Sequence, residues 1–175
     1  MFKGFRKYAN AGSIQSDFSS GGVSAANMGA LRKLLGKYGV KPSDLLIVCG
    51  VSGYNDLVNL SETLTAEKVG TQAARILTGL APTLLGIPII TSEKVREDLN
   101  ATAVYDGTTT TKGSILLVHR PSWIVGVRRG FTVETDVDKA AQVNQIIASF
   151  RRAFMPMETP STALPSVGIG FNYDA

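Results

Sequence analysis

The chain carries one histidine, His119, and one cysteine, Cys49, and these side chains are the best candidates for nucleophilic catalysis. A Ser-His-Asp or Cys-His centre would have to use them. His119 ends an apolar run of strand length, and no Gly-x-Ser-x-Gly motif occurs. Cys49 ends a second apolar run, where burial would raise its pKa and keep the thiol protonated. We interpret both residues as structural and predict that the chain is not an enzyme.

A glycine-rich turn at residues 50–53 follows the run that ends in Cys49. Backbone amides at a helix start attract anions, so such a turn could hold a phosphate. The spacing matches neither the Gly-x-Gly-x-x-Gly pattern of dinucleotide sites nor the P-loop. We interpret Gly50 and Gly53 as residues that ease a tight strand-to-helix turn, and we predict no cofactor.

Three carboxylates, Glu134, Asp136 and Asp138, alternate along a predicted strand and would project from one face. In principle they could share a hard cation. No other acidic cluster or glycine turn completes such a site, so we interpret them as a solvated polar face and predict no metal.

Two arginine pairs, at 128–129 and 151–152, could contact phosphates. The pairs contain no interleaved aromatic residues, and the formal net charge of the whole chain is only +4. These features give weak support for nucleic-acid recognition. Charges of this kind more often support subunit contacts or solubility.

The composition bounds the class of protein. With 175 residues, 44% of them hydrophobic and 18% charged, the chain is long enough to bury a core, and disorder of the whole chain is excluded. A single cysteine forms no internal disulfide, which fits assembly inside a cell. We find no secretory signal and no membrane-spanning run in the sequence, so we expect no membrane partner.

Hydrophobic spacing predicts the elements that hold these residues. The apolar positions between residues 24 and 38 follow helical spacing, and a short helix is expected over residues 54–60. Residues 9–27 are small and polar and predict a surface loop. Residues 142–154 are ambiguous, because Ile146, Ala148 and Phe150 also fit a strand, but periodicity favours a further helix there. The predicted strands are residues 45–49, covered on both faces, residues 86–91, residues 114–119, buried behind a loop at 106–113, and residues 131–137, half-buried by their alternation.

These patterns describe an α/β domain without an assembled active site. Four stretches, taken in order, resemble the carboxyl-terminal half of the major capsid proteins of tailed double-stranded DNA phages, the Hong Kong 97-like family. They are NMGALRKLLGKYGVKPSDL at 27–45, TGL at 78–80, LGIPIITSE at 85–93 and WIVGVRRGFTVE at 123–134. The order and spacing of the stretches are more specific than any one of them.

The resemblance implies an α+β fold with a central mixed sheet flanked by helices, the axial lobe, and a partial peripheral lobe. Carried over by position, residues 1–45 form part of the peripheral lobe with the first helix, residues 46–154 form the axial lobe, and residues 155–175 return to the peripheral lobe. The resemblance also implies a strand over most of residues 144–154, against the periodicity. Because the amino-terminal arm, the hairpin extension and the spine helix of the family have no counterpart, we expect a fragment.

The function that the resemblance implies is structural. The chain would be a shell subunit of a phage or prophage, located in the virion capsid and in the host cytoplasm during assembly. Its partners would be copies of itself in pentamers and hexamers, with packaged DNA on the inner face bound without sequence specificity. We expect Arg128, Arg129, Glu134 and Asp136 to contact neighbouring subunits.

Two alternatives remain open at this point. An encapsulin-like nanocompartment shell protein resembles the same fold but encloses an enzyme. A small α/β anion-binding domain would use the turn at residues 50–53 together with His119.

Overall fold

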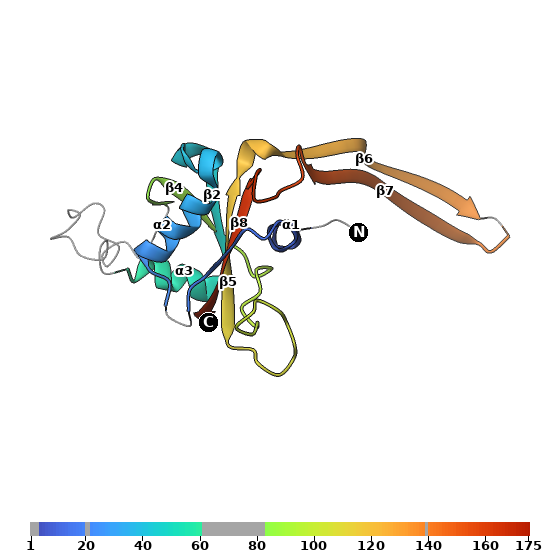
Figure 1. Cartoon of the computed structure of the whole chain (residues 1–175). Coiled ribbons are helices and arrows are strands. Elements are labelled where there is room, and N and C mark those ends of the chain that lie inside the picture. The colour runs from blue at the N-terminus through green and yellow to red at the C-terminus, as the bar shows by residue number, and fades with distance from the viewer. Residues whose placement is uncertain (1–3, 20–21, 61–82, 139) are drawn as a thin grey trace, which may run out of the picture.

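The computed structural model of the chain describes residues 4–19, 22–60, 83–138 and 140–175. These residues form a six-stranded sheet with helices on both sides, and a long two-stranded hairpin that extends away from it (Figure 1). The helices are α1 (Phe5–Ala11), α2 (Ala25–Leu34) and α3 (Val51–Val58), with short 3-10 turns at Gly36–Gly39, Pro42–Asp44 and Arg120–Ser122. The strands are β1 (Gln15–Asp17), β2 (Leu45–Cys49), β3 (Thr83–Leu84), β4 (Ile87–Thr91), β5 (Lys112–His119), β6 (Trp123–Asp138), β7 (Val143–Pro156) and β8 (Val167–Asp174).

The sheet is mixed, in the order β1-β8-β5-β2-β4-β3. Strand β5 pairs antiparallel with β8 and β2, whereas β2 pairs parallel with β4 and β8 pairs parallel with β1. A central mixed sheet confirms the α+β class and corrects the α/β class expected from the residue pattern alone. The sheet joins strands from all three predicted segments, and the division into lobes at residues 45 and 154 stays a prediction.

Strand β5 lies in the middle of the sheet and is buried on both faces. Ile115 and Leu117 pack in the cluster under α2 and α3, while Leu116 and Val118 pack in the cluster under α1 (Figure 1). A strand covered on both faces reads as a continuous apolar run, which is why the sequence predicted this strand correctly. The predicted strands at β2 and β4 are confirmed too, although Leu46 and Val48 of β2 are only half-buried.

Strand β8 alternates large residues with glycines. Val167 and Ile169 are fully buried in the cluster under α1. A Cβ atom at Gly168 would lie 3.0 Å from a methyl group of Leu35, and one at Gly170 would overlap the ring of Phe18. The glycines therefore let the elements on that side approach the backbone of β8 closely.

Helix α2 confirms the helix expected from residue 24 onward. Ser24 occupies its N-cap with an extended backbone, and the Oγ atom of Ser24 accepts a hydrogen bond of 3.1 Å from the backbone N–H of Asn27. Met28 and Leu31 of this helix are buried against the sheet. The sequence pattern, the cap and the packing agree on where the helix begins.

Removing this cap is expected to lower the free energy of unfolding by about 1 kcal/mol in Ser24→Ala, because one amide at the helix start loses its acceptor. Urea denaturation measures the change. Ser24→Asp is the matched control, since aspartate caps as well as serine. Equal stability of Ser24→Ala and the unmodified chain would show that the cap contributes nothing.

The expected surface loop at residues 9–27 is wrong. This segment contains the end of α1, the strand β1 and the start of α2, and four of its apolar side chains are buried: Ala9, Ile14, Phe18 and Val23. The strand is only three residues long and pairs with β8. Isolated apolar residues spaced this widely show no period, so the burial depends on the partner strand.

Two further boundaries differ from the prediction. The segment within residues 142–154 is strand β7 and not the helix that its periodicity favoured, so the resemblance predicted this element correctly. Helix α3 begins at Val51, with Gly50 as its N-cap, and not at residue 54. The resembling stretch at 78–80 lies outside the described residues.

Candidate assembly surface

Strands β6 and β7 form a ribbon whose two faces differ in chemistry. Residues 123–127 pair with residues 152–156, and residues 132–138 pair with residues 143–149. Directly paired residues share a face, and successive residues of a strand alternate between faces. The even-numbered residues of β7 and their partners form what we call the apolar face. The odd-numbered residues of β7 and their partners form the polar face, which carries most of the charged side chains of the ribbon but also the exposed Ile124, Val143, Ile147 and Met155.

The apolar face carries large hydrophobic side chains that the described part of the chain leaves uncovered. Ile146 is 74% exposed and Phe131, which alternates with Val133, is 71% exposed. The alternation predicted for residues 131–137 is confirmed, but the expected half-burial is wrong, because none of the described residues forms a second layer over this part of the ribbon. The exposed members of the face are Val125, Val127, Phe131, Val133, Val137, Ile146 and Phe150.

At the base of the ribbon, helix α1 covers the same face. The ring of Phe5 lies 4.7 Å from that of Trp123 and 5.1 Å from that of Phe154, both edge-on. Trp123 and Phe154 stack on each other at 5.2 Å, and Tyr8 contacts Trp123 edge-on at 5.4 Å. The apolar face therefore begins in the buried cluster under α1 and continues along the ribbon without a cover.

A β-bulge gathers arginines on the polar face. The register shifts between Val127 and Arg129, so that Arg128 and Arg129 together oppose Arg151. In a regular strand, consecutive residues would point to opposite faces. These three arginines instead line one hollow of about 380 Å³.

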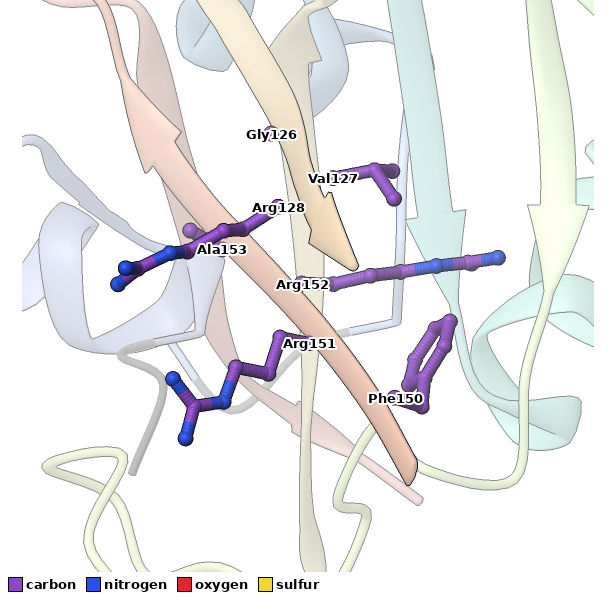
Figure 2. A pocket seen from close by; sticks show the side chains of 7 residues that line it. All are labelled: Gly126, Val127, Arg128, Phe150, Arg151, Arg152 and Ala153. Atoms are coloured by element: carbon purple, nitrogen blue, oxygen red, sulfur yellow. The ribbon is translucent and has the colours of Figure 1, made fainter. Parts of the chain in front are cut away.

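Figure 2 shows how the arginines divide between the faces. Arg128 and Arg151 point to one side of the ribbon, whereas Arg152 points to the other, beside Val127 and Phe150. The guanidinium of Arg152 lies 4.3 Å from the centre of the Phe150 ring, in cation–π contact. Arg151 and Arg152 are consecutive residues of β7 and therefore lie on opposite faces (Figure 2).

The polar face carries its carboxylates farther toward the tip. Glu134 pairs with Ile147 and Asp136 pairs with Gln145, so both project from this face, while the side chain of Asp138 lies outside the described part. The expectation that Arg128, Arg129, Glu134 and Asp136 contact neighbouring subunits stays a prediction. The structure places all four on one exposed face.

Among the described residues, no three His, Cys, Asp or Glu side chains come together in a way that could hold a metal ion.

His119 lies where β5 ends, next to the turn that leads into the ribbon. Its Nδ1 atom lies 2.7 Å from the Oγ atom of Ser122, and its ring lies 4.9 Å from that of Tyr38. Partial burial lowers the pKa of His119, and the nearby carboxylate of Asp44 opposes this shift. These contacts join the end of β5 to the 3-10 turn that precedes β6 and to the turn that contains Tyr38.

The turn at residues 50–53 is filled by the chain itself. An Oε1 atom of Glu97 accepts a hydrogen bond of 3.0 Å from the backbone N–H of Gly53, and a Cβ atom at Gly50 would overlap the Glu97 carboxyl group. A carboxylate of this chain thus occupies the place that a bound anion would take. Burial, with a smaller contribution from Glu97, raises the pKa of Cys49 to about 12, so its thiol stays protonated.

Comparisons with known proteins address the fold. No protein-family model matches the chain. The major capsid protein of Escherichia phage T5 is 25% identical over 114 residues, which cover 65% of this chain and 22% of that protein. Among solved structures, a chain of Mycobacterium phage Che8 superposes with a TM-score of 0.63 at 17% identity, covering 95% of this chain and 56% of that chain.

Two solved phage capsids show the same structural similarity to this chain. The mature capsid of bacteriophage PhiM1 gives a TM-score of 0.62 at 9% identity, over 90% of this chain and 50% of that chain. The capsid of cyanophage P-SCSP1u gives 0.60 at 12% identity, over 91% and 53%. The chain has the Hong Kong 97-like capsid fold. It spans about half the length of these solved chains.

Within this capsid fold, sequence reasoning missed the contribution of β7 to the apolar face. Ile146, Ala148 and Phe150 alternate in the same way as residues 131–137, and that spacing was the available signal. Val143, Ile147 and Phe154 complete a helical period in the same segment, so the period alone favoured a helix over the strand.

None of the described helices is long and apolar enough to cross a membrane.

Proposed function

We propose that the chain is a structural subunit of a tailed-phage capsid shell and that copies of it associate through the apolar face of the ribbon. The observation that carries the proposal is the long run of exposed hydrophobic side chains on a ribbon with no second layer. Contiguous apolar surface of this kind marks interaction sites in soluble proteins. The likeness to the T5 major capsid protein and to the PhiM1 capsid supports the shell.

The apolar face of the ribbon is suited to burial that the described residues do not supply. An isolated two-stranded hairpin is marginal in water, and an added hydrophobic layer stabilises it. Helix α1 shows how this works at the base, where Phe5 and Tyr8 cover Trp123 and Phe154. Neighbouring subunits would cover the remainder. Each large apolar side chain that becomes fully buried contributes about 1.5–3 kcal/mol.

The finer parts of the role belong to the same proposal. The subunits would form pentamers and hexamers in the virion capsid, with assembly in the host cytoplasm and packaged DNA on the inner face. No catalytic step is part of this function. The protonated Cys49 and the occupied turn at Gly53 support that view.

Sedimentation velocity over a concentration series tests the proposal. The chain is expected to associate, and the double substitution Phe131→Ser with Ile146→Ser is expected to lower the association constant at least about a hundredfold, which corresponds to ~3 kcal/mol of lost apolar burial. Both side chains are exposed, so thermal unfolding of the double variant is expected to change little.

Val40→Ser is the matched control, because Val40 is 69% exposed and lies outside the ribbon. It is expected to associate like the unmodified chain. A chain that stays monomeric at every concentration, or an equal loss of association in Val40→Ser, would contradict the proposal.

A further inference from the structure

The polar face of the ribbon is divided by charge. Near the base it carries Arg128, Arg129 and Arg151, and toward the tip it carries Glu134 and Asp136. A neutral pair, Thr132 with Ser149, separates the two groups. Along β7, residue 149 lies midway between residues 151 and 147, about 7 Å from each at the rise of an antiparallel strand. Along β7 the partners of Arg129 and Glu134 are thus equally far from the neutral pair, although a second register shift on β6 separates Arg129 from Thr132 by three residues.

None of these charges finds an opposite charge in the described part of the chain. The ion pairs there are Arg96 with Asp98 and Lys112 with Asp174, both outside the ribbon. Arg129 and Arg151 oppose each other directly, an arrangement of like charges that destabilises a strand pair. The ribbon therefore holds an exposed positive cluster that is open to an opposite charge from another molecule.

The neutral pair is small and already ordered. The Oγ1 atom of Thr132 and the Oγ atom of Ser149 lie 2.7 Å apart, and an Nη atom of Arg129 donates to the same Ser149 oxygen at 3.2 Å. This contact directs the guanidinium of Arg129 toward the middle of the face. Beyond the arginines, Gly126 pairs with Ala153, so the face stays free of bulky side chains there.

We propose that the polar faces of two copies pack antiparallel about a two-fold axis at the Thr132–Ser149 pair. Arg129 of each copy then faces Glu134 of the other, Arg151 faces Ile147, and Asp136 projects over the small Gly126 and Ala153, beside Arg128. The inference rests on the proposed function and names a second contact, on the face opposite to the apolar one. A two-fold contact requires a self-complementary surface, which this charge order provides.

The charge order also disfavours other occupants. Parallel packing of two copies would set arginines against arginines and carboxylates against carboxylates, which costs free energy. A nucleic acid that follows the face would meet Glu134 and Asp136, whose charge repels phosphate. A second copy in antiparallel orientation satisfies both halves of the face.

Complementary charge reversal tests the pairing by sedimentation equilibrium at low salt. Arg129→Glu and Glu134→Arg are each expected to lower self-association about tenfold, because each variant sets like charges across the axis twice. An equimolar mixture of the two variants is expected to associate like the unmodified chain, since residues 129 and 134 again meet opposite charges. A mixture that associates no better than the separate variants would overturn the proposal.

Disulfide trapping locates the axis. Ser149→Cys is expected to form a covalent dimer under mild oxidation, because residue 149 of one copy meets residue 149 of the other. Ile124→Cys, on the same face but near the base, is the matched control and is expected to stay unlinked. Equal cross-linking of both variants, or none at residue 149 while the chain associates, would overturn the axis. A negative result in the charge-reversal or disulfide experiment leaves the proposed function intact. The proposed function is tested separately, by the substitutions on the apolar face.

Discussion

Replacing Tyr173 by alanine is expected to lower the free energy of unfolding by about 3–5 kcal/mol. The side chain is fully buried in β8, where its ring lies over two glycines. A Cβ atom at Gly53 would lie 2.6 Å from the Tyr173 Oη atom, and one at Gly113 would overlap the ring. Truncation therefore leaves a cavity that these backbones cannot easily fill. Urea denaturation followed by circular dichroism measures the loss.

Tyr173→Phe separates the ring from the hydroxyl group. The Oη atom lies 3.4 Å from the carbonyl oxygen of Ser114, and burial, with smaller contributions from Glu97, Cys49 and Asp56, raises the pKa of Tyr173, so the hydroxyl stays protonated. Removing it is expected to cost only about 1 kcal/mol. A loss as large in Tyr173→Phe as in Tyr173→Ala would assign the stability to the hydroxyl and contradict the packing argument.

Gly170→Val is expected to destabilise the chain by about 3 kcal/mol. Gly170 lies in β8, between β1 and β5, and a Cβ atom there would overlap the buried ring of Phe18. The valine side chain needs space that the ring occupies, so β8 and the segment after β1 must separate. Differential scanning calorimetry measures the shift in Tm.

Two controls accompany this substitution. Gly130→Ala adds a Cβ atom where nothing lies within 4 Å, and it is expected to leave stability nearly unchanged. Combining Gly170→Val with Phe18→Ala is expected to cost less than the sum of the two single losses, because the smaller side chain makes room. Additive losses would show that the clash with Phe18 is not the cause.

These variants separate two properties of the molecule. The sheet and its helices hold the buried side chains, so substitutions at Tyr173 and Gly170 change folding. The ribbon holds exposed side chains, so substitutions at Phe131, Ile146, Arg129 and Glu134 are expected to change association and not stability. The chain thus has a buried body and an exposed ribbon.

Strands β2, β4 and β5 and helix α2 could be predicted from local patterns alone. Continuous apolar runs bounded by turns are typical of buried central strands, and helical spacing after a serine cap predicts an amphipathic helix. The amphipathic alternation of residues 131–137 was readable in the same way, and with it the side-by-side placement of Glu134 and Asp136.

Other features depended on residues far apart in the chain. The segment of β7 fits a helix and a strand equally well by period, and its pairing with β6 selects the strand. The bulge that brings Arg128 and Arg129 to one face is a property of two paired strands, so no single strand could reveal it. The glycines at 113 and 170 had no local explanation until Tyr173 and Phe18 came to lie against them, and the turn glycines 50 and 53 also make room for Glu97 and Tyr173.

The hydrophobic period along the chain thus specified most strands and helices of the six-stranded sheet domain. Within one helix or strand, the position of a residue along the chain decides which face its side chain occupies. The register between paired strands and the close approach of side chains to the glycines depend on contacts between distant segments. The exposure of the ribbon depends on which of the described segments pack against it. Those contacts depend on which strands pair and on which surfaces stay uncovered, and the period of a single segment contains neither.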